Sequence, residues 1–406
     1  MRKMCGVAFA FVALGLFLSA CGQVATPPAS QPASAASLQP SNTPRQASTR
    51  RPNPTHTDSL SPTPYPTDTA SPTATLTSTP TATTTPSASP SPSRTATPTI
   101  TLSPTRDPAQ PTLFPMSIEA MRQGSYPGSE IVIDQKLDAG ANYQRYYVYY
   151  LSQGLKIYAL LTVPDGKMPK GGWPGIVFNH GYIPPAEYHT TERYVAYVDR
   201  LARSGYVVFR IDYRGHGHSE GEAEGAYGDP GYEVDVLNAV ASLKRYPQVN
   251  PQKIGMWGHS MGGYLTLRCM VISKDVKVGV IWSGVVAAYP DLLYNWPAGP
   301  SIPPANSRQW MDDWPAQFGT PEENPAFWDS ISANSYLADL SGPLQLHYGS
   351  ADEDVPPSFS ESLAEQAGAA GHPVELYVYL GDNHNLTNYF NLAMDRTIAF
   401  FDAVLK

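Results

Sequence analysis

Two patterns of hydrophobic and polar residues alternate along the chain after residue 112. Short runs rich in β-branched and aromatic residues predict strands, whereas apolar residues spaced three or four apart predict helices. Because the two patterns follow one another to the C-terminus, they indicate repeated strand and helix units. Eight strands are expected, at residues 144–151, 155–163, 176–178, 206–211, 253–257, 278–282, 344–348 and 374–380.

Helical patterns separate most of these strands, and the first two strands form a hairpin around residues 152–154. A hairpin followed by repeated strand and helix units is typical of an α/β fold, with a mostly parallel sheet and helices on both faces. The helices are expected at residues 194–202, 234–243, 261–272, 358–370 and 388–405.

Residues 21–112 differ from the rest in composition, being mainly Ser, Thr, Pro and Ala with hardly an aromatic residue. Such a segment cannot bury enough apolar surface to offset the entropy lost on ordering. We therefore expect a disordered stalk, of a composition that is also typical of O-glycosylated stalks, followed by one globular domain at 113–406.

The first 20 residues combine a basic start at Arg2 and Lys3 with an apolar run at 7–18. Small residues then precede Cys21, which resembles a bacterial lipoprotein signal whose Cys is acylated and becomes the new N-terminus. A simple secretory signal and a transmembrane anchor are the alternatives, although the run is shorter than the usual span of about 20 residues. We expect a protein outside the cytoplasm, held on the outer side of the bacterial cell membrane by lipid on Cys21 alone.

Net charge limits the classes of partner that the protein can bind, and cysteine content shows whether disulfides can stabilise it. The formal net charge is −8, and −10 once the two cationic residues of the signal are removed, which argues against a nucleic-acid partner. Cys5 would leave with the signal and Cys21 would carry lipid, so Cys269 has no partner for an intrachain disulfide. Stability must therefore come from a hydrophobic core.

A Gly-His-Ser-Met-Gly sequence centred on Ser260 matches the nucleophile elbow, with a predicted strand before it and a predicted helix after it. The sharp turn lifts the hydroxyl above the sheet edge, and the helix N-terminus favours negative charge. The sequence predicts Ser260 as a nucleophile, against the alternative of a structural Gly-rich turn.

A serine nucleophile needs a base and an orienting carboxylate, which in this arrangement follow in the order acid and then His. Asp352 and His384 each lie in a loop at the C-terminal end of a strand, where ligand sites of open α/β sheets gather. Asp354 and Asp382 are the alternatives to Asp352. Asp382 shares the loop of His384 and would have to fold back, and Asp354 lies closer to the next helix, so Asp352 is preferred.

The tetrahedral oxyanion of acyl transfer needs donors, for which we expect the backbone N–H groups of Tyr182 and Met261. His180 beside Tyr182 is expected to hold its loop rather than to act in catalysis. The segment 212–221 contains His and Asp residues, but its spacing matches no zinc signature. It is interpreted as a tight Gly-rich loop bordering the active site, and no metal or cofactor is expected.

An aromatic-rich insertion at residues 287–340 separates the last strands and is expected to form a small cap. Its Trp296 and Trp310, together with Tyr182, are predicted to contact substrate in an apolar pocket. The alternative is that these aromatic side chains only fill the core of the insertion.

The elbow, the loop of His180 and Gly181, the Asp-Tyr-Arg-Gly segment at 212–215 and the segment 349–356 together resemble α/β-hydrolases of the prolyl oligopeptidase type. The dipeptidyl aminopeptidase and acylaminoacyl peptidase branch is most similar, over about residues 140–406. The resemblance implies an α/β-hydrolase fold with Ser260 as nucleophile, Asp352 as orienting acid and His384 as base. Peptidases of this family usually carry a β-propeller, and here the stalk stands in its place.

Three functions remain open at this point. The first is a peptidase that cleaves short peptides, and the second is a carboxylesterase acting on small acyl or carbohydrate esters, because both reactions use the same triad. The third is a surface binding protein without catalysis. The sequence does not determine the acyl group, the leaving group or the oligomeric state.

Overall fold

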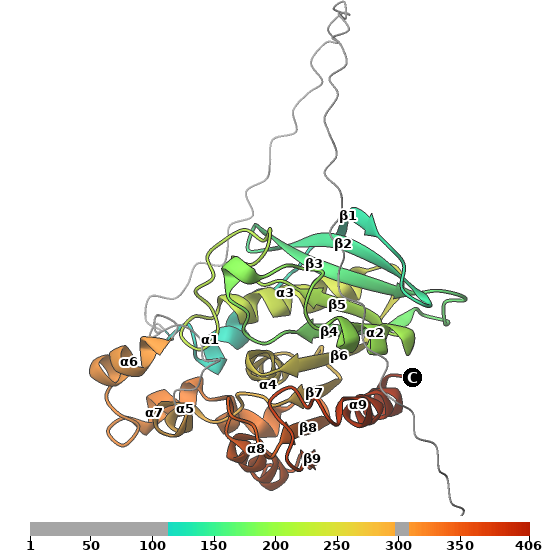
Figure 1. Cartoon of the computed structure of the whole chain (residues 1–406). Helices are drawn as coiled ribbons and strands as arrows, with labels where there is room; N and C mark the ends of the chain where they lie inside the picture. Colours follow the sequence, from blue (N-terminus) through green and yellow to red (C-terminus); the bar gives the residue numbers. More distant parts are fainter. Residues whose placement is uncertain (1–112, 297–307) are drawn as a thin grey trace, which may run out of the picture. The chain divides into compact units, whose positions relative to one another are not determined.

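A nine-stranded sheet forms the centre of the computed structural model, which describes residues 113–296 and 308–406. The expected signal at 1–20, the lipidation site Cys21 and the stalk at 21–112 lie outside these residues. The strand order is β1-β2-β3-β5-β4-β6-β7-β8-β9, which Figure 1 shows as a stack from β1 to β9. The strands are β1 (Val132–Leu137), β2 (Tyr143–Ser152), β3 (Leu155–Pro164), β4 (Trp173–Asn179), β5 (Val207–Ile211), β6 (Val249–His259), β7 (Val278–Trp282), β8 (Leu344–Gly349) and β9 (Glu375–Tyr379).

The expected hairpin and parallel sheet are both confirmed. β2 and β3 pair antiparallel up to Ser152↔Leu155, and Gln153 and Gly154 make the turn with positive φ angles. β3 also pairs antiparallel with β5. From β5 to β9 in the sheet order every pairing is parallel, with β4 between β5 and β6. The carboxyl ends of β4, β6 and β8 therefore lie at one edge of the sheet, where the candidate site is found.

The sheet has one strand more than the eight expected. β1 is an edge strand that pairs antiparallel with β2, and nearly all of its residues are exposed. Because it buries no face, its sequence lacks the apolar alternation from which strands are recognised. A register shift between Ile133 and Gln135 adds to the irregularity.

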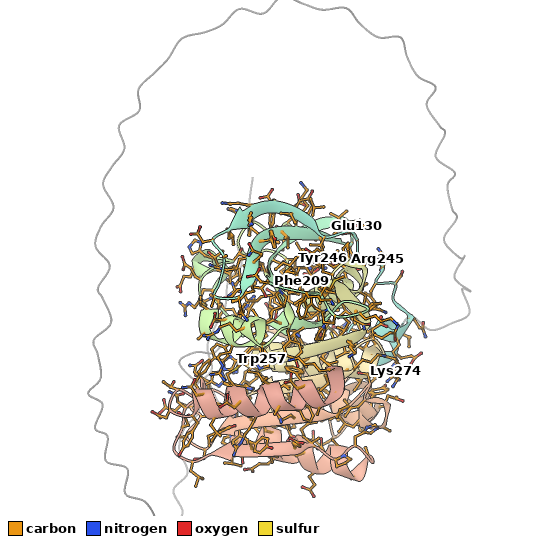
Figure 2. The ribbon with its side chains drawn as sticks, turned by 90° about the vertical axis from the view of Figure 1, so that its right-hand side faces the viewer. Glu130, Phe209, Arg245, Tyr246, Trp257 and Lys274 are labelled. Carbon is orange, nitrogen blue, oxygen red and sulfur yellow. The ribbon has the colours of Figure 1, made fainter. Side chains whose placement is uncertain are left out.

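Helices cover both faces of the sheet, as expected. One face carries α2 (Val195–Arg203) and α9 (Phe390–Leu405), and the other carries α3 (Gly231–Arg245), α4 (Met261–Ile272) and α8 (Pro357–Ala369). Each face has its own hydrophobic cluster of buried side chains. In Figure 2, Trp257 and Phe209 lie in the interior, and both side chains are fully buried. The free Cys269 is buried in α4.

The described part of the 287–340 insertion is helical. It contains α5 (Tyr289–Asn295), α6 (Trp310–Phe318) and α7 (Pro325–Ile331), and the rings of Phe318 and Phe327 stack at 4.2 Å. Phe114, from before the first helix α1 (Ile118–Gln123), packs edge-on against Trp314 at 5.3 Å. Most aromatic side chains of the insertion thus fill its own core. None of the helices described is long and apolar enough to cross a bilayer.

Candidate active site

Ser260 occupies the single-residue turn between β6 and α4. Its backbone has φ 55° and ψ −119°, a conformation that is costly for a residue with a side chain and persists only where the surroundings enforce it. The Ser260 N–H donates to the Trp282 carbonyl at 3.0 Å, and the Ser260 carbonyl accepts from Val285 N–H at 3.1 Å. The elbow that the sequence predicts is therefore present and is tied to the end of β7.

Gly262, the second residue of α4, allows this helix to approach the loop that follows β4. A Cβ atom at Gly262 would lie 2.0 Å from the Asn179 carbonyl oxygen, closer than any side-chain contact permits. The same loop continues through Gly181 to Tyr182. The glycine thus lets the elbow and the expected oxyanion loop pack directly against each other.

Asp352 and His384 are brought together from the loops after β8 and β9. The Nδ1 atom of His384 lies 2.8 Å from Asp352 Oδ2 and 3.0 Å from Oδ1, and the two side chains are 11% and 1% exposed. Asp352 Oδ1 also accepts the backbone N–H groups of Asp354 and Val355, each at 2.9 Å. Burial raises the pKa of Asp352, but the hydrogen bond and charge of His384 and these two N–H groups outweigh it and hold the pKa below its usual value. Asp352 is therefore ionised at neutral pH.

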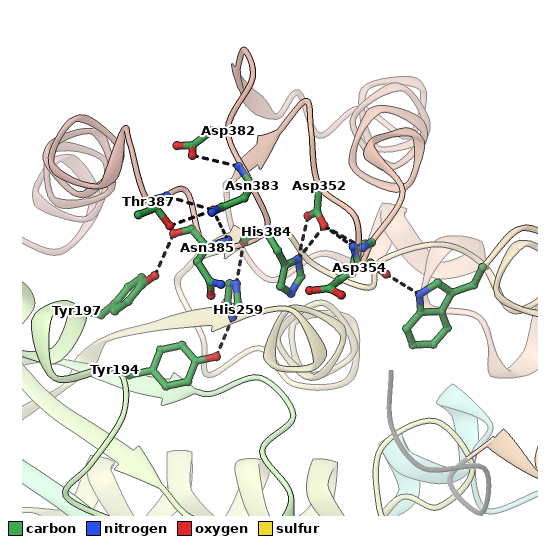
Figure 3. Close-up of polar contacts among 12 residues, drawn as sticks. Tyr194, Tyr197, His259, Asp352, Asp354, Asp382, Asn383, His384, Asn385 and Thr387 are labelled. Carbon is green, nitrogen blue, oxygen red and sulfur yellow. Dashed lines mark hydrogen bonds and ion pairs between the residues drawn. The ribbon is translucent and has the colours of Figure 1, made fainter. Parts of the chain in front are cut away.

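The two alternative acids are held in other ways, Asp382 through its carboxylate and Asp354 through its backbone (Figure 3). Asp382 is fully buried and accepts the backbone N–H groups of Asn388 and Tyr389 just before α9, at 3.0–3.2 Å. Asp354 donates its N–H to Asp352 and accepts the Trp296 indole N–H at its carbonyl, 3.1 Å away. Of the three carboxylates, Asp352 alone contacts the imidazole.

Ser260 and His384 line the same pocket, which has a volume of about 280 Å³. No hydrogen bond joins Ser260 Oγ to His384 within the described part of the chain; the two residues meet across the pocket. Tyr182 and Trp296, two of the three residues predicted to contact substrate, also line it. The other lining residues are Gly181, Ile183, Arg193, Tyr194, Tyr197, Tyr227, His259, Asp354, Val355 and Asn385.

Trp310 does not line this pocket, so its contact with substrate remains a prediction. It lines a neighbouring depression of about 560 Å³ together with Tyr182 and Met261. Its ring packs against Tyr289 at 5.2 Å and Trp314 at 5.3 Å, and it is 4% exposed. This packing within the insertion agrees with the alternative considered for these aromatic residues.

The two expected oxyanion donors flank Ser260. Met261 follows it directly as the first residue of α4, and Tyr182 lines both the pocket and the depression. Neither backbone N–H donates to another residue of segments 113–296 and 308–406. The N-terminus of α4 also favours negative charge at this position. The arrangement is compatible with an oxyanion hole, and the role of both groups remains a prediction.

The segment 212–221 lies behind the oxyanion loop rather than at the pocket, since none of its residues lines the pocket of Ser260. The Tyr213 hydroxyl donates to the His180 carbonyl at 3.1 Å, and His180 Nδ1 lies 2.6 Å from the Gly181 carbonyl. His180 is fully buried, and burial holds its pKa well below the usual value. Both features support the loop that carries Tyr182. Among the residues described, no three His, Cys, Asp or Glu side chains gather as metal ligands would.

Two residues of the site were not singled out from the sequence. In the sequence, His259 is only the second residue of the elbow motif, and Tyr194 is only the first residue of a predicted helix. In the structure the Tyr194 hydroxyl lies 2.7 Å from His259 Nδ1. The one available signal was that a histidine directly precedes the predicted nucleophile.

Comparisons with known proteins identify the family of the chain. The model of the prolyl oligopeptidase family matches residues 193–406. The chain is 26% identical over 244 residues to the uncharacterized peptidase YuxL of Bacillus subtilis, covering 59% of this chain and 35% of that protein. It is 26% identical over 254 residues to the uncharacterized peptidase YtmA of the same organism, covering 62% of this chain and 89% of that protein.

Solved structures show the same fold. An acetyl xylan esterase from Paenibacillus sp. R4 superposes with a TM-score of 0.54 at 20% identity, over 71% of this chain and 92% of that one. The expected α/β-hydrolase fold is therefore confirmed. Of the two Bacillus subtilis relatives, the chain spans about a third of the length of YuxL and most of the length of YtmA.

Proposed function

The chain belongs to the prolyl oligopeptidase family and is a serine hydrolase, and we propose that it cleaves amide bonds of short peptides through Ser260, Asp352 and His384. The observation that carries the proposal is the contact of His384 Nδ1 with the buried carboxylate of Asp352, in the pocket that also contains Ser260 on its strained turn. This is the arrangement that activates a serine hydroxyl.

In the first half of the reaction, Ser260 Oγ attacks the carbonyl carbon of the scissile bond while His384 Nε2 takes up the hydroxyl proton. The imidazolium that forms is stabilised by Asp352, whose charge and position at Nδ1 keep Nε2 available as the base. The carbonyl oxygen becomes an oxyanion, for which the backbone N–H groups of Tyr182 and Met261 are the donors.

In the second half, the tetrahedral intermediate collapses and the C–N bond breaks. His384 gives its proton to the departing amine, which leaves an acyl ester on Ser260. Water then attacks this ester, again with His384 as base, and a second collapse releases the acid and restores the Ser260 hydroxyl. Every proton that leaves a nucleophile thus passes through His384.

The pocket favours small substrates. Its volume of about 280 Å³ lies at the lower end of small-molecule sites, and aromatic side chains of Tyr182, Tyr227 and Trp296 form much of its wall. The names of YuxL and YtmA as peptidases support amide cleavage. We propose a short peptide as the substrate.

A carboxylesterase is the second candidate, since ester cleavage passes through the same oxyanion and needs the same groups. It is favoured by the compact domain that the chain shares with an acetyl xylan esterase, because 92% of that protein is covered. The deciding experiment compares p-nitrophenyl esters with aminoacyl p-nitroanilides on the full-length protein. A higher kcat/KM on the anilides supports the peptidase, and activity on the esters alone overturns it.

Labelling by a fluorophosphonate tests whether the protein is catalytic at all. The reagent phosphonylates an activated serine, so we expect labelling of the wild-type chain and none of Ser260→Ala. An unlabelled wild-type protein would support the third candidate, a surface binding protein without catalysis.

We also propose that the protein is a lipoprotein outside the cytoplasm, anchored through Cys21. The support is the apolar run at 7–18 and the small residues before Cys21. Cys21→Ser is expected to move the protein from the membrane fraction into the soluble fraction, because one lipid-modified residue would hold it there. If the variant still sediments with membranes after a salt wash, the lipoprotein assignment is wrong.

A further inference from the structure

Three loops of the site are joined by one chain of hydrogen bonds between residues that line the pocket. Figure 3 shows the part that runs from Tyr194 through His259 to His384. Gly181 N–H donates to the Tyr194 hydroxyl oxygen at 3.0 Å, the Tyr194 hydroxyl lies 2.7 Å from His259 Nδ1, and His259 Nε2 lies 3.0 Å from the His384 carbonyl. The chain begins beside Tyr182, passes beside Ser260 and ends on the backbone of the base.

The direction of each bond follows from the chemistry of its atoms. Burial lowers the pKa of His259 to about 3, so its imidazole is neutral and carries one N–H. The His384 carbonyl can only accept, which places that hydrogen on Nε2 and leaves Nδ1 as an acceptor. Burial raises the pKa of Tyr194 to about 12, so its hydroxyl keeps the proton that it donates to Nδ1. The polar atoms of both side chains are thereby satisfied in a single arrangement.

Packing leaves little freedom around this chain. His259 is 3% exposed, and its ring lies 4.6 Å from the ring of His384 between centroids. A Cβ atom at Gly181 would lie 2.8 Å from the Tyr194 hydroxyl and 3.1 Å from Ser260 Cβ, so a side chain there would displace one of them. Tyr194 itself sits at the start of α2 with φ 55°, a conformation that its surroundings must enforce.

We propose that Tyr194 and His259 are positioning residues that hold the oxyanion loop and the base loop in register with Ser260. This inference rests on the proposed function. The two residues need not touch substrate; they set the distance between the Tyr182 N–H, the serine and the imidazole. Since small displacements of reacting groups are costly, loss of the link should lower kcat more than it changes KM.

The first test is Tyr194→Phe, which leaves Gly181 N–H and His259 Nδ1 without partners. We expect kcat on a p-nitrophenyl ester to fall about 10- to 100-fold, with KM changed by less than about threefold. The matched control is Tyr206→Phe, which removes another buried hydroxyl, bonded to Asp402 far from the pocket. The control should lower the melting temperature comparably and leave kcat unchanged. Equal kcat in the two variants overturns the proposal.

The second test separates the two links of His259. Gln can keep the donor to the His384 carbonyl while losing the acceptor for Tyr194, and Asn can keep that acceptor while losing the donor. If the chain acts as a unit, Tyr194→Phe costs much less in the H259Q background than in the wild type. Equal losses in both backgrounds contradict the coupling. If the Tyr194→Phe protein does not fold, H259Q and H259N carry the test on their own. Each breaks one link and should lower kcat with little change in KM, and an unchanged kcat in both variants overturns the proposal.

The outcomes also distinguish the positioning role from the function itself. A wild-type protein that a fluorophosphonate fails to label contradicts the proposed function. Normal labelling of the wild type, together with an unchanged kcat in Tyr194→Phe, contradicts the positioning role alone.

Discussion

Two buried carboxylates, each in a loop that follows a strand of the sheet, show how differently one side chain can be used. Asp352 follows β8, and Asp212 directly follows β5. Asp352 contacts His384 and two backbone N–H groups, whereas Asp212 accepts from the hydroxyls of Tyr188, at 2.6 Å, and Thr190. The pKa of Asp352 is held below its usual value, and burial raises that of Asp212 from 3.8 to about 6.

The difference teaches that burial alone does not make an orienting acid. Hydroxyl donors lower the pKa of Asp212 less than desolvation raises it, so this carboxyl is partly protonated near pH 6. Asp352 has a partner that can itself become charged, and that partner faces a pocket. Asp212 stabilises a loop, whereas Asp352 is suited to stabilise an imidazolium.

The largest effect expected is that of Ser260→Ala, which tests whether the pocket beside Asp352 is the reaction centre. Removing the nucleophile should lower kcat by about a millionfold, as it does where a serine acts with its triad as a unit. The measurement is ester hydrolysis with a folded, purified variant. Residual activity above about a tenth of the wild type would exclude Ser260 as the nucleophile.

The next effect concerns the choice of acid. Asp352→Asn preserves the shape of the side chain but removes its charge and favours the wrong imidazole tautomer, which in serine proteases lowers kcat about ten-thousandfold. Asp354→Asn is the matched comparison two residues away, and it should cost far less because its carboxylate does not contact His384. Near-normal turnover in Asp352→Asn with collapse in Asp354→Asn would reverse the assignment.

The smallest effect is expected for Asp212→Asn, and it should appear in stability rather than in turnover. Because the folded protein binds the Asp212 proton more tightly than the unfolded chain, the wild type loses stability as pH rises from about 4 to about 7. The shift corresponds to roughly 3 kcal/mol, which the Asn variant cannot show.

The measurement is the difference in the free energy of unfolding between Asp212→Asn and the wild type at the two pH values. The difference cancels contributions from other groups and should move in favour of the variant as pH rises. A constant difference would mean that Asp212 titrates normally, and the contrast with Asp352 would then disappear.

The sequence by itself determined most of the architecture and the position of the elbow that carries Ser260. Strands buried on both faces read as continuous apolar runs, and a strand, a Gly-His-Ser-Met-Gly turn and a helix define the elbow without tertiary information. The chain order of Ser260, Asp352 and His384 is likewise local information. β1 is not predicted from the sequence because it is held by pairing with β2 rather than by burial. Backbone pairing produces no apolar pattern in the sequence.

Only the tertiary structure decided which of several similar residues lies at the site and which distant residues are in contact. Asp352 and Asp354 are alike as residues, and the turn that points two N–H groups at Asp352 Oδ1 separates them. Trp296 lines the pocket and donates to the Asp354 carbonyl, whereas Trp310 packs against Tyr289 and lines the neighbouring depression. The bond between Tyr194 and His259 joins residues 65 positions apart. Such contacts depend on how the loops meet at the sheet edge, and no local pattern encodes that meeting.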